Sequence, residues 1–258
     1  MDSKEIVILG AGNVATHLSR HLHARGHRIL CIWSPGGESA RQLARELDCG
    51  WTSLKPEIPG KADFYVFCIP DHAVSDLALD LAHCRGCFLH TAGALSMDVF
   101  SGRTGAYGVL YPLQTLSRKR ILKSAAIPFL VEASSREILE QLKALASSIS
   151  DEVREADSAS RLKMHLAAVF ANNFSNHMVT VARELAREWG MDPDLLKPLL
   201  EETYAKLLEL GAREAQTGPA VRGDVQSMER HINLLQDHPE WQNLYTFISR
   251  DIMRSRKT

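Results

Sequence analysis

The stretch Glu5-Ile6-Val7-Ile8-Leu9-Gly10-Ala11-Gly12-Asn13-Val14-Ala15 decides the fold of this chain. An apolar run stops at a pair of glycines, and a helical pattern begins directly after them. The order predicts a strand, a tight turn and a helix N-terminus, whose unpaired N–H groups and positive dipole end suit a pyrophosphate. Gly10 allows the turn, Gly12 lets phosphates approach the backbone, and Ala15 takes the helix-packing position of G-x-G-x-x-G/A. A plain strand-to-helix turn is the alternative, but the position between a strand and an amphipathic helix favours a dinucleotide held by Gly10, Gly12, Asn13 and Val14.

The composition is that of an ordinary globular protein. The chain has 258 residues, of which 45% are hydrophobic and 24% are charged, and its formal net charge is −1. Nucleic acid and acidic membranes need a basic face, so neither is expected as a partner. The apolar runs are too short to cross a bilayer, and no basic segment with a secretory apolar core opens the chain. We therefore expect a cytoplasmic protein that acts on a small molecule.

Five cysteines fit a reducing compartment better than a disulfide framework. Cys84 and Cys87 form a single C-x-x-C, but they follow a helical pattern, where the helix dipole does not favour a thiolate. We interpret this pair as a chance spacing. His90, His165 and His231 lack the short spacing of metal ligands, so no metal is expected.

The first half of the chain alternates β-rich runs with helical patterns, which is typical of a parallel sheet with right-handed crossovers. The expected strands are Glu5–Leu9, Arg28–Trp33, Asp63–Ile69, Cys87–Thr91, Tyr107–Leu110, Pro128–Val131 and Glu152–Arg154. The expected helices between them are Val14–Ala24, Glu38–Leu47, Val74–His83 and Arg136–Ser147. The fold class is thus α/β, a Rossmann-like parallel sheet domain over residues 1–155 followed by an all-α domain over residues 156–258.

The all-α half is predicted to begin with a long helix, Ser158–Trp189, that ends at Gly190. Pro193 then begins a second helix that runs to about Leu210. Asp224 caps a third helix that extends to Gln236, and His238-Pro239 begins the last one.

The segment after the second strand bears on the choice of cofactor. An acidic residue normally stands about 20 positions beyond the glycines and binds the ribose of NAD. Here Trp33-Ser34-Pro35 occupies that place, and Arg41 follows on the next helix, so Ser34 and Arg41 favour the 2′-phosphate of NADP. Glu38 counts against this interpretation. A turn without ribose selectivity is the alternative, which keeps NAD possible.

Two further strand ends should face the cofactor crevice, because ligands of parallel sheets bind outside the carboxyl ends of the strands. The first carries Ile69 and Pro70, followed by Asp71, which we interpret as a helix N-cap. The second carries His90 and Thr91, with Ser96 as the N-cap of the next helix. The imidazole of His90 can donate to a carbonyl or shuttle a proton, although a buried structural histidine is the alternative.

The long helix carries His165, Asn172 and Asn176 at positions i, i+7 and i+11. At 3.6 residues per turn these three side chains share one face, and Asn173 lies about 100° around the helix from Asn172. Polar side chains on an otherwise apolar helix predict a polar cleft wall, and an internal hydrogen-bond network is the alternative.

Arg222 precedes the helix that Asp224 caps. A guanidinium at this position can bind a carboxylate or a phosphate of a ligand. The alternatives are that it pairs with Asp224 or reaches across a dimer interface.

Several segments together resemble a known group of proteins. They are His90-Thr91-Ala92-Gly93-Ala94-Leu95-Ser96, Tyr111-Pro112-Leu113-Gln114-Thr115, Arg161 with His165, Asn172-Asn173-Phe174, and Gln216–Asp224 with His231. The chain resembles the superfamily of pyrroline-carboxylate reductases and phosphogluconate dehydrogenases, and more narrowly an uncharacterised bacterial family of Rossmann-like NADP oxidoreductases. The resemblance implies a dinucleotide-binding domain, a helical domain that often dimerises, and an active cleft between them. It implies no particular substrate.

The leading hypothesis is an NADP-dependent oxidoreductase that transfers hydride to or from a carbonyl or imine of a small acidic metabolite. His90 or His165 is the expected proton donor, Asn172 and Asn173 orient the substrate, and Arg222 binds its carboxylate. A homodimer through the helical domain is expected. The alternative is a dinucleotide-binding sensor or regulatory protein without turnover.

Overall fold

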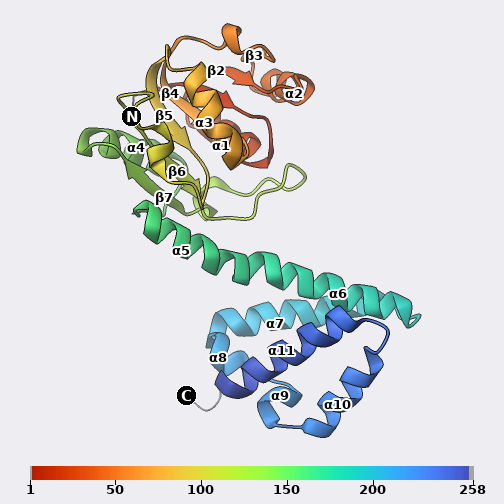
Figure 1. Ribbon diagram of the computed structural model, residues 1–258. Helices are drawn as coiled ribbons and strands as arrows, with labels where there is room; N and C mark the ends of the chain where they lie inside the picture. Colours follow the sequence, from red (N-terminus) through yellow and green to blue (C-terminus); the bar gives the residue numbers. More distant parts are fainter. Residues whose placement is uncertain (1, 256–258) are drawn as a thin grey trace. The chain divides into compact units, whose positions relative to one another are not determined.

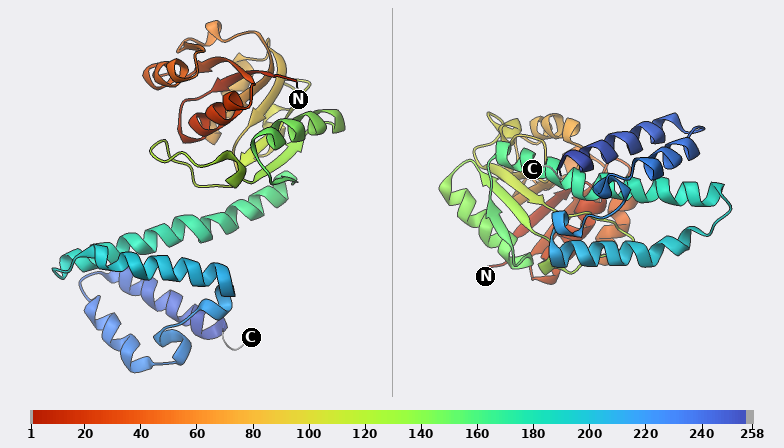
Figure 2. Two further views of the ribbon diagram at one scale, coloured as in Figure 1. Left: turned by 180° about the vertical axis from the view of Figure 1, so that it is seen from behind. Right: turned by 90° about the horizontal axis from the view of Figure 1, so that it is seen from below.

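The computed structural model describes residues 2–255 and separates into two compact units, Met1–Asn172 and Asn173–Thr258. The first unit combines a sheet with helices, and the second is entirely helical where it is described (Figures 1 and 2). The first unit includes the helix that begins at Ser158, and the domain boundary after residue 155 stays a prediction.

An eight-stranded sheet forms the centre of the first unit, in the order β3-β2-β1-β4-β5-β6-β7-β8. The strands are β1 Glu5–Leu9, β2 Arg28–Trp33, β3 Gly50–Thr52, β4 Lys61–Phe67, β5 Arg85–His90, β6 Tyr107–Pro112, β7 Phe129–Ala133 and β8 Val153–Glu155. The Rossmann-like α/β class is confirmed, with one correction to the parallel sheet: β6 and β7 pair antiparallel. Parallel strands need a crossover connection that is usually a helix, and only the short 3₁₀ helix η3 (Ser124–Ala126) lies between these two.

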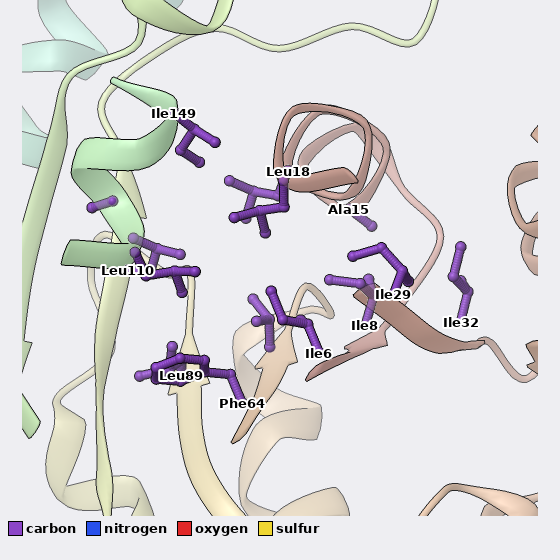
Figure 3. Packing of buried hydrophobic residues seen from close by; sticks show 14 of the residues in the cluster. Ile6, Ile8, Ala15, Leu18, Ile29, Ile32, Phe64, Leu89, Leu110 and Ile149 are labelled. Atoms are coloured by element: carbon purple, nitrogen blue, oxygen red, sulfur yellow. The ribbon is translucent and has the colours of Figure 1, made fainter. Parts of the chain in front are cut away.

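Helices cover both faces of the sheet. They are α1 Asn13–Ala24, α2 Glu38–Glu46, α3 Asp71–Asp80 and α4 Arg136–Ile149, with the 3₁₀ helices η1 Lys55–Glu57 and η2 Met97–Phe100. Alternate residues of β1 pack into two different hydrophobic cores, one on each face of the sheet. Ile6 and Ile8 pack with Leu18 of α1 and with α4 (Figure 3), whereas Val7 and Leu9 pack with α3. This alternation is the reason why β1 reads as a continuous apolar run: both of its faces are buried.

Helix starts follow the sequence signals with one exception. Ser96 caps η2 by accepting a hydrogen bond from the Asp98 N–H, as predicted. The prediction that Asp71 is an N-cap is wrong, because α3 already begins at Asp71 and Pro70 is its N-cap residue. Asp71 therefore places its carboxylate in the first turn, where it stabilises the helix through the dipole.

The long helix predicted over residues 158–189 contains a local change of winding. It consists of α5 Ser158–Ala168, the π-helical segment η4 Val169–Phe174 and α6 Ser175–Glu188. A π-helix bonds i to i+5 and has more residues per turn than an α-helix. The 3.6-residue spacing therefore does not apply across this segment, and the prediction that His165, Asn172 and Asn176 share one face on that ground is wrong.

The second unit is built from helices of which three start where the sequence predicts, at Pro193, after Asp224 and at Pro239, whereas the short helices Ala212–Ala215 and Pro219–Arg222 were not predicted. The helices beyond α6 are η5 Pro193–Leu196, α7 Lys197–Leu210, α8 Ala212–Ala215, α9 Pro219–Arg222, α10 Val225–Leu234 and α11 Pro239–Ser255. Asp192 and Asp224 accept capping hydrogen bonds at η5 and α10. Within residues 2–255, no helix combines the length and the apolar character needed to span a lipid bilayer.

Candidate functional site

The glycine turn after β1 has the geometry that a dinucleotide requires. Gly10 has φ +116°, and a Cβ atom there would stand 2.2 Å from the Cys68 carbonyl oxygen. A Cβ on Gly12 would meet no atom within 4 Å, so the space above this residue is open. Gly12 is also the N-cap residue of α1 and has no side chain to cap it, which leaves the N–H groups of Asn13 and Val14 pointing out of the helix. These features fit a pyrophosphate at the position that the sequence predicts.

A cleft of about 700 Å³ extends from this turn along the carboxyl ends of the strands. Five of the predicted cofactor residues line it: Gly10, Gly12, Ser34, Ile69 and Pro70. It is also lined by residues to which the sequence assigned no role: Trp33, Lys55, Ala73, Asp76 and Leu77. The apolar lining residues offer a dry surface against which a planar nucleobase can pack. The volume of the cleft lies within the ordinary range of small-molecule sites.

Ser34 and Arg41 lie where the sequence places them, after β2 and on α2. The Ser34 backbone bonds to Thr52 and Gly37, which shapes the turn. The guanidinium of Arg41 lies 3.9 Å from the carboxylate of Glu38, and its buried Nε has no hydrogen-bond partner among residues 2–255. Glu38 thus partly neutralises the cation that the sequence assigned to a 2′-phosphate.

His90 is the last residue of β5 and Thr91 follows it, and the two side chains lie in different environments. The Thr91 hydroxyl donates to the Phe67 carbonyl at 3.2 Å and so joins the ends of β5 and β4. His90 is fully buried, and its Nδ1 accepts a hydrogen bond from the Ala92 N–H at 3.2 Å. Burial, reinforced by the nearby charge of Arg161, lowers the pKa of His90 to about 3. The imidazole is therefore neutral at physiological pH and fixes the turn after β5.

A buried ion pair holds that turn against α5. The Arg161 side chain is 1% exposed and donates from Nη1 to the carboxylate of Glu132 at 2.5 Å. Its Nη2 donates to the Leu95 carbonyl at 2.5 Å and to the Ser158 hydroxyl at 3.1 Å. Glu132 also accepts from the N–H and the hydroxyl of Ser158. The loop after β5, the strand β7 and the start of α5 are thereby linked through one arginine.

His165 faces the same loop from α5. Its Nδ1 lies 2.9 Å from the Tyr111 hydroxyl oxygen, at the carboxyl end of β6. A Cβ on Gly93 would stand 2.5 Å from the same Nδ1, so the imidazole packs directly against the backbone of the loop. His165 is half-buried, and burial raises the pKa of Tyr111 while the charge of Arg161 opposes the rise. The hydroxyl is therefore protonated at neutral pH, and the pair can deliver a proton.

The other predicted catalytic residues stand outside this cluster of contacts. Asn172 and Asn173 are exposed in η4, and Arg222 is exposed at the last position of α9 in the second unit. His231 bonds to the Tyr245 hydroxyl at 2.8 Å within that unit. No group of three or more His, Cys, Asp or Glu side chains that could hold a metal ion occurs in the described part of the chain.

In the hydrogen-bonded cluster around α5, neither Tyr111 nor Glu132 received a role from the sequence. Tyr111 stands at the end of a predicted strand, as His90 does, and that position was the available signal. Glu132 gives no such signal. A carboxylate near a strand end is ordinary, and its importance depends on a partner 29 residues away.

Comparisons with known proteins agree with this geometry. The profile described as "NADP oxidoreductase coenzyme F420-dependent" matches residues 5–86, and a domain of unknown function, DUF2520, matches residues 127–252. A putative NADP oxidoreductase from Bacteroides fragilis is 40% identical, with 98% of each chain covered and a TM-score of 0.93. No curated protein matches.

Two more distant structures share the fold. A protein from Thermotoga maritima is 21% identical with a TM-score of 0.80, and the comparison covers 96% of this chain and 99% of that one. A reductive aminase from Aspergillus terreus in complex with NADPH and ethyl levulinate is 16% identical with a TM-score of 0.73, over 99% and 95% of the two chains. By its identity to the Bacteroides fragilis protein over nearly the whole length, the chain belongs to the family of Rossmann-like NADP oxidoreductases with a DUF2520 region.

Proposed function

We propose that this protein is an NADP-dependent oxidoreductase that transfers hydride between the nicotinamide ring and a carbonyl or imine carbon of a small acidic metabolite. One observation carries the proposal. The Tyr111–His165 hydrogen bond lies at the carboxyl edge of the same sheet that holds the open glycine turn. A phosphate-binding turn and a proton-donating pair at one edge are the two parts that such a reaction requires.

The protein's own part of the reaction is proton transfer and positioning. When bound, the reduced cofactor supplies the hydride and its electron pair, and the substrate oxygen or nitrogen then takes up one proton. Either tautomer of His165 leaves a proton donor available. If Nε2 carries the proton, the Tyr111 hydroxyl donates to Nδ1 and Nε2–H can donate to the substrate. If Nδ1 carries the proton, it donates to the Tyr111 oxygen, and the hydroxyl proton is free to be donated. His90 is not assigned this role, because its ring is fully buried.

Binding of the substrate is assigned to exposed polar groups. We propose that the amides of Asn172 and Asn173 orient the substrate and that the Arg222 guanidinium binds its carboxylate. Their exposure and their side-chain chemistry support this assignment.

We also propose a homodimer through the helical unit. Large apolar side chains are widely exposed there: Leu195 is 74% exposed, Leu208 is 83% exposed and Phe247 is 74% exposed. Exposed apolar side chains of this size are typical of surfaces that bind another protein when they form one patch, and we propose that they do so here. Sedimentation equilibrium of the full chain measures the oligomeric state, and a monomer at micromolar concentration would contradict the proposal.

The test of the function begins with cofactor binding. Purified protein should be stabilised against heat more by NADPH than by NADH, because ligands that bind only the folded state raise the melting temperature. A panel of keto acids and cyclic imines should then cause loss of NADPH absorbance. Binding of NADPH without turnover on any member of the panel would instead favour a sensor.

Tyr111→Phe tests the proton-donating pair. We expect kcat to fall by about 100-fold or more, since general acid catalysis typically contributes that much. The affinity for NADPH should stay unchanged, because the hydroxyl bonds only to His165 among the described residues. Tyr107→Phe on the same strand is the matched control and should retain activity, because Tyr107 contributes ring contacts with Phe100. Equal kcat values for the two variants would remove Tyr111 from the mechanism.

A further inference from the structure

The loop between β6 and η3, residues 113–123, lies against the start of α1 (Figures 1 and 2). The Arg118 N–H donates to Asn13 Oδ1 at 3.2 Å, and the Ser117 carbonyl lies 3.1 Å from Nε2 of His17. His17 is fully buried in α1, so this second contact attaches the loop to a rigid element. The loop therefore has a defined position beside the glycine turn.

That position places a cation directly beside the glycine turn, in a hollow that Arg118 and Ser39 line together with Arg20 and Glu46. Nη1 of Arg118 lies 3.4 Å from the Ala11 carbonyl oxygen in the glycine turn and 3.5 Å from the Ser39 hydroxyl in the first turn of α2. Both hydrogen bonds are long. Arg118 is exposed, and its Nε and Nη2 have no protein partner within residues 2–255. The guanidinium can accept a bidentate anion without losing an established ion pair.

The neighbouring arginines differ in this respect. Arg41 lies 3.9 Å from the Glu38 carboxylate, and Arg20 pairs with Glu46 across α1 and α2. No carboxylate lies within 4.0 Å of the Arg118 guanidinium in the described part of the chain. Of these three arginines, Arg118 is therefore the one without a carboxylate partner in the described residues, since Glu46, which lines the same hollow, pairs with Arg20.

We propose that Arg118 is the residue that selects NADP over NAD, by binding the 2′-phosphate of the adenosine ribose between the glycine turn and α2. The inference rests on the proposed function and deepens it. In an α/β sheet of this type the ribose lies beyond the end of β2, next to the glycine turn, and Ala11 and Ser39 occupy those two sides. A 2′-phosphate there lies within reach of Arg118, with the Ser34 and Ser39 hydroxyls as further donors. Arg41 then contributes less than the sequence suggests, because Glu38 partly neutralises it.

Calorimetric titration of the full chain with four probes tests the inference. The probes are NADPH, NADH, adenosine 2′,5′-bisphosphate and 5′-AMP, so that the 2′-phosphate is varied with and without the nicotinamide. Arg118→Gln should weaken the binding of NADPH and of the bisphosphate by about 10- to 100-fold, the range expected for a hydrogen-bonded charge pair. Its affinity for NADH and for 5′-AMP should change less than about twofold.

Lys119→Gln is the matched control, since it removes the same charge from the adjacent exposed position. It should leave all four affinities within about twofold, and Arg118→Lys should fall between wild type and Arg118→Gln. Unchanged melting temperatures confirm that the variants fold.

The outcomes separate the two proposals. Preferential binding of NADPH by the wild type, with Arg118→Gln indistinguishable from it, overturns the role of Arg118 and leaves the proposed function standing. Equal losses for NADPH and NADH in Arg118→Gln assign the arginine to the pyrophosphate or to the turn, and also overturn the inference. A wild-type protein that binds neither dinucleotide overturns the proposed function itself.

Discussion

Replacement of Arg161 by methionine should destabilise the first unit severely. The variant keeps most of the apolar volume of the side chain but removes the one cation within residues 2–255 that pairs with the largely buried Glu132 carboxylate. Glu132 is 14% exposed and retains two hydrogen bonds from Ser158, while the Leu95 carbonyl loses its donor. Breaking one side of a buried ion pair typically costs about 3–5 kcal/mol, because the remaining charge stays buried without compensation.

The change should be visible as a lower melting temperature. A domain of this size loses roughly 2–4 °C per kcal/mol, so we expect a decrease of about 6–20 °C in the transition of the first unit. Urea unfolding followed by circular dichroism gives the free energy of unfolding directly.

Matched variants distinguish the ion pair from general damage. Glu132→Gln should also destabilise, and the double variant should lose less free energy of unfolding than the sum of the two single losses. Arg154→Met is the control, because Arg154 pairs with Glu152 at the surface, where such pairs contribute less than about 1 kcal/mol. An Arg161→Met variant within about 1 kcal/mol of the wild type would refute the reasoning, as would additive losses in the double variant.

Two further predictions concern the end of β5 and the loop that follows it. Gly93→Ala should reduce turnover strongly while the protein still folds. The new Cβ would stand 2.5 Å from His165 Nδ1 and displace the ring from Tyr111. Gly105→Ala is the control and should be neutral in the same assay, because a Cβ there meets no atom within 4 Å. His90→Asn should make stability less dependent on pH. The pKa of His90 is about 3 in the folded protein against an ordinary value of 6.5, so below pH 6.5 the unfolded chain takes up a proton that the folded chain does not. The free energy of unfolding of the wild type should fall by up to about 1.4 kcal/mol per pH unit from this residue as the pH decreases towards 3, and the variant should lack this part of the slope.

The outcomes of these two experiments are separable. Normal activity in Gly93→Ala would show that the contact between the loop and His165 is not needed. Parallel curves of unfolding free energy against pH for wild type and His90→Asn would show that His90 titrates normally in the folded protein.

Much of the first unit was predictable because its signals are local. β1 and β2 have the predicted bounds, and the glycine turn has the predicted conformation, since an apolar run followed by Gly10 and Gly12 leaves few alternatives. β3 was missed, whereas β8, which is also three residues long, was predicted to within one residue, so very short strands are found inconsistently from sequence. The starts of α10 and α11 follow from Asp224 and Pro239, residues with strong positional preferences at helix starts.

The less predictable features depend on distant partners. Three features depend on residues from separate elements. They are the burial of His90, the Glu132–Arg161 ion pair and the Tyr111–His165 hydrogen bond. The π-helical segment Val169–Phe174 has no composition that distinguishes it from an α-helix. Periodicity reports the average winding of a helix, and a single turn with a different winding leaves that average almost unchanged.

The antiparallel pairing of β6 with β7 has a consequence for how members of this family can diverge. Since β6 ends and β7 begins at the same edge of the sheet, the chain between Pro112 and Phe129 need not travel the length of the domain. A crossover would have to keep a fixed minimum length, whereas a reversal at one edge can gain or lose residues at small entropic cost. The segment can therefore change in length and charge without altering the register of any strand.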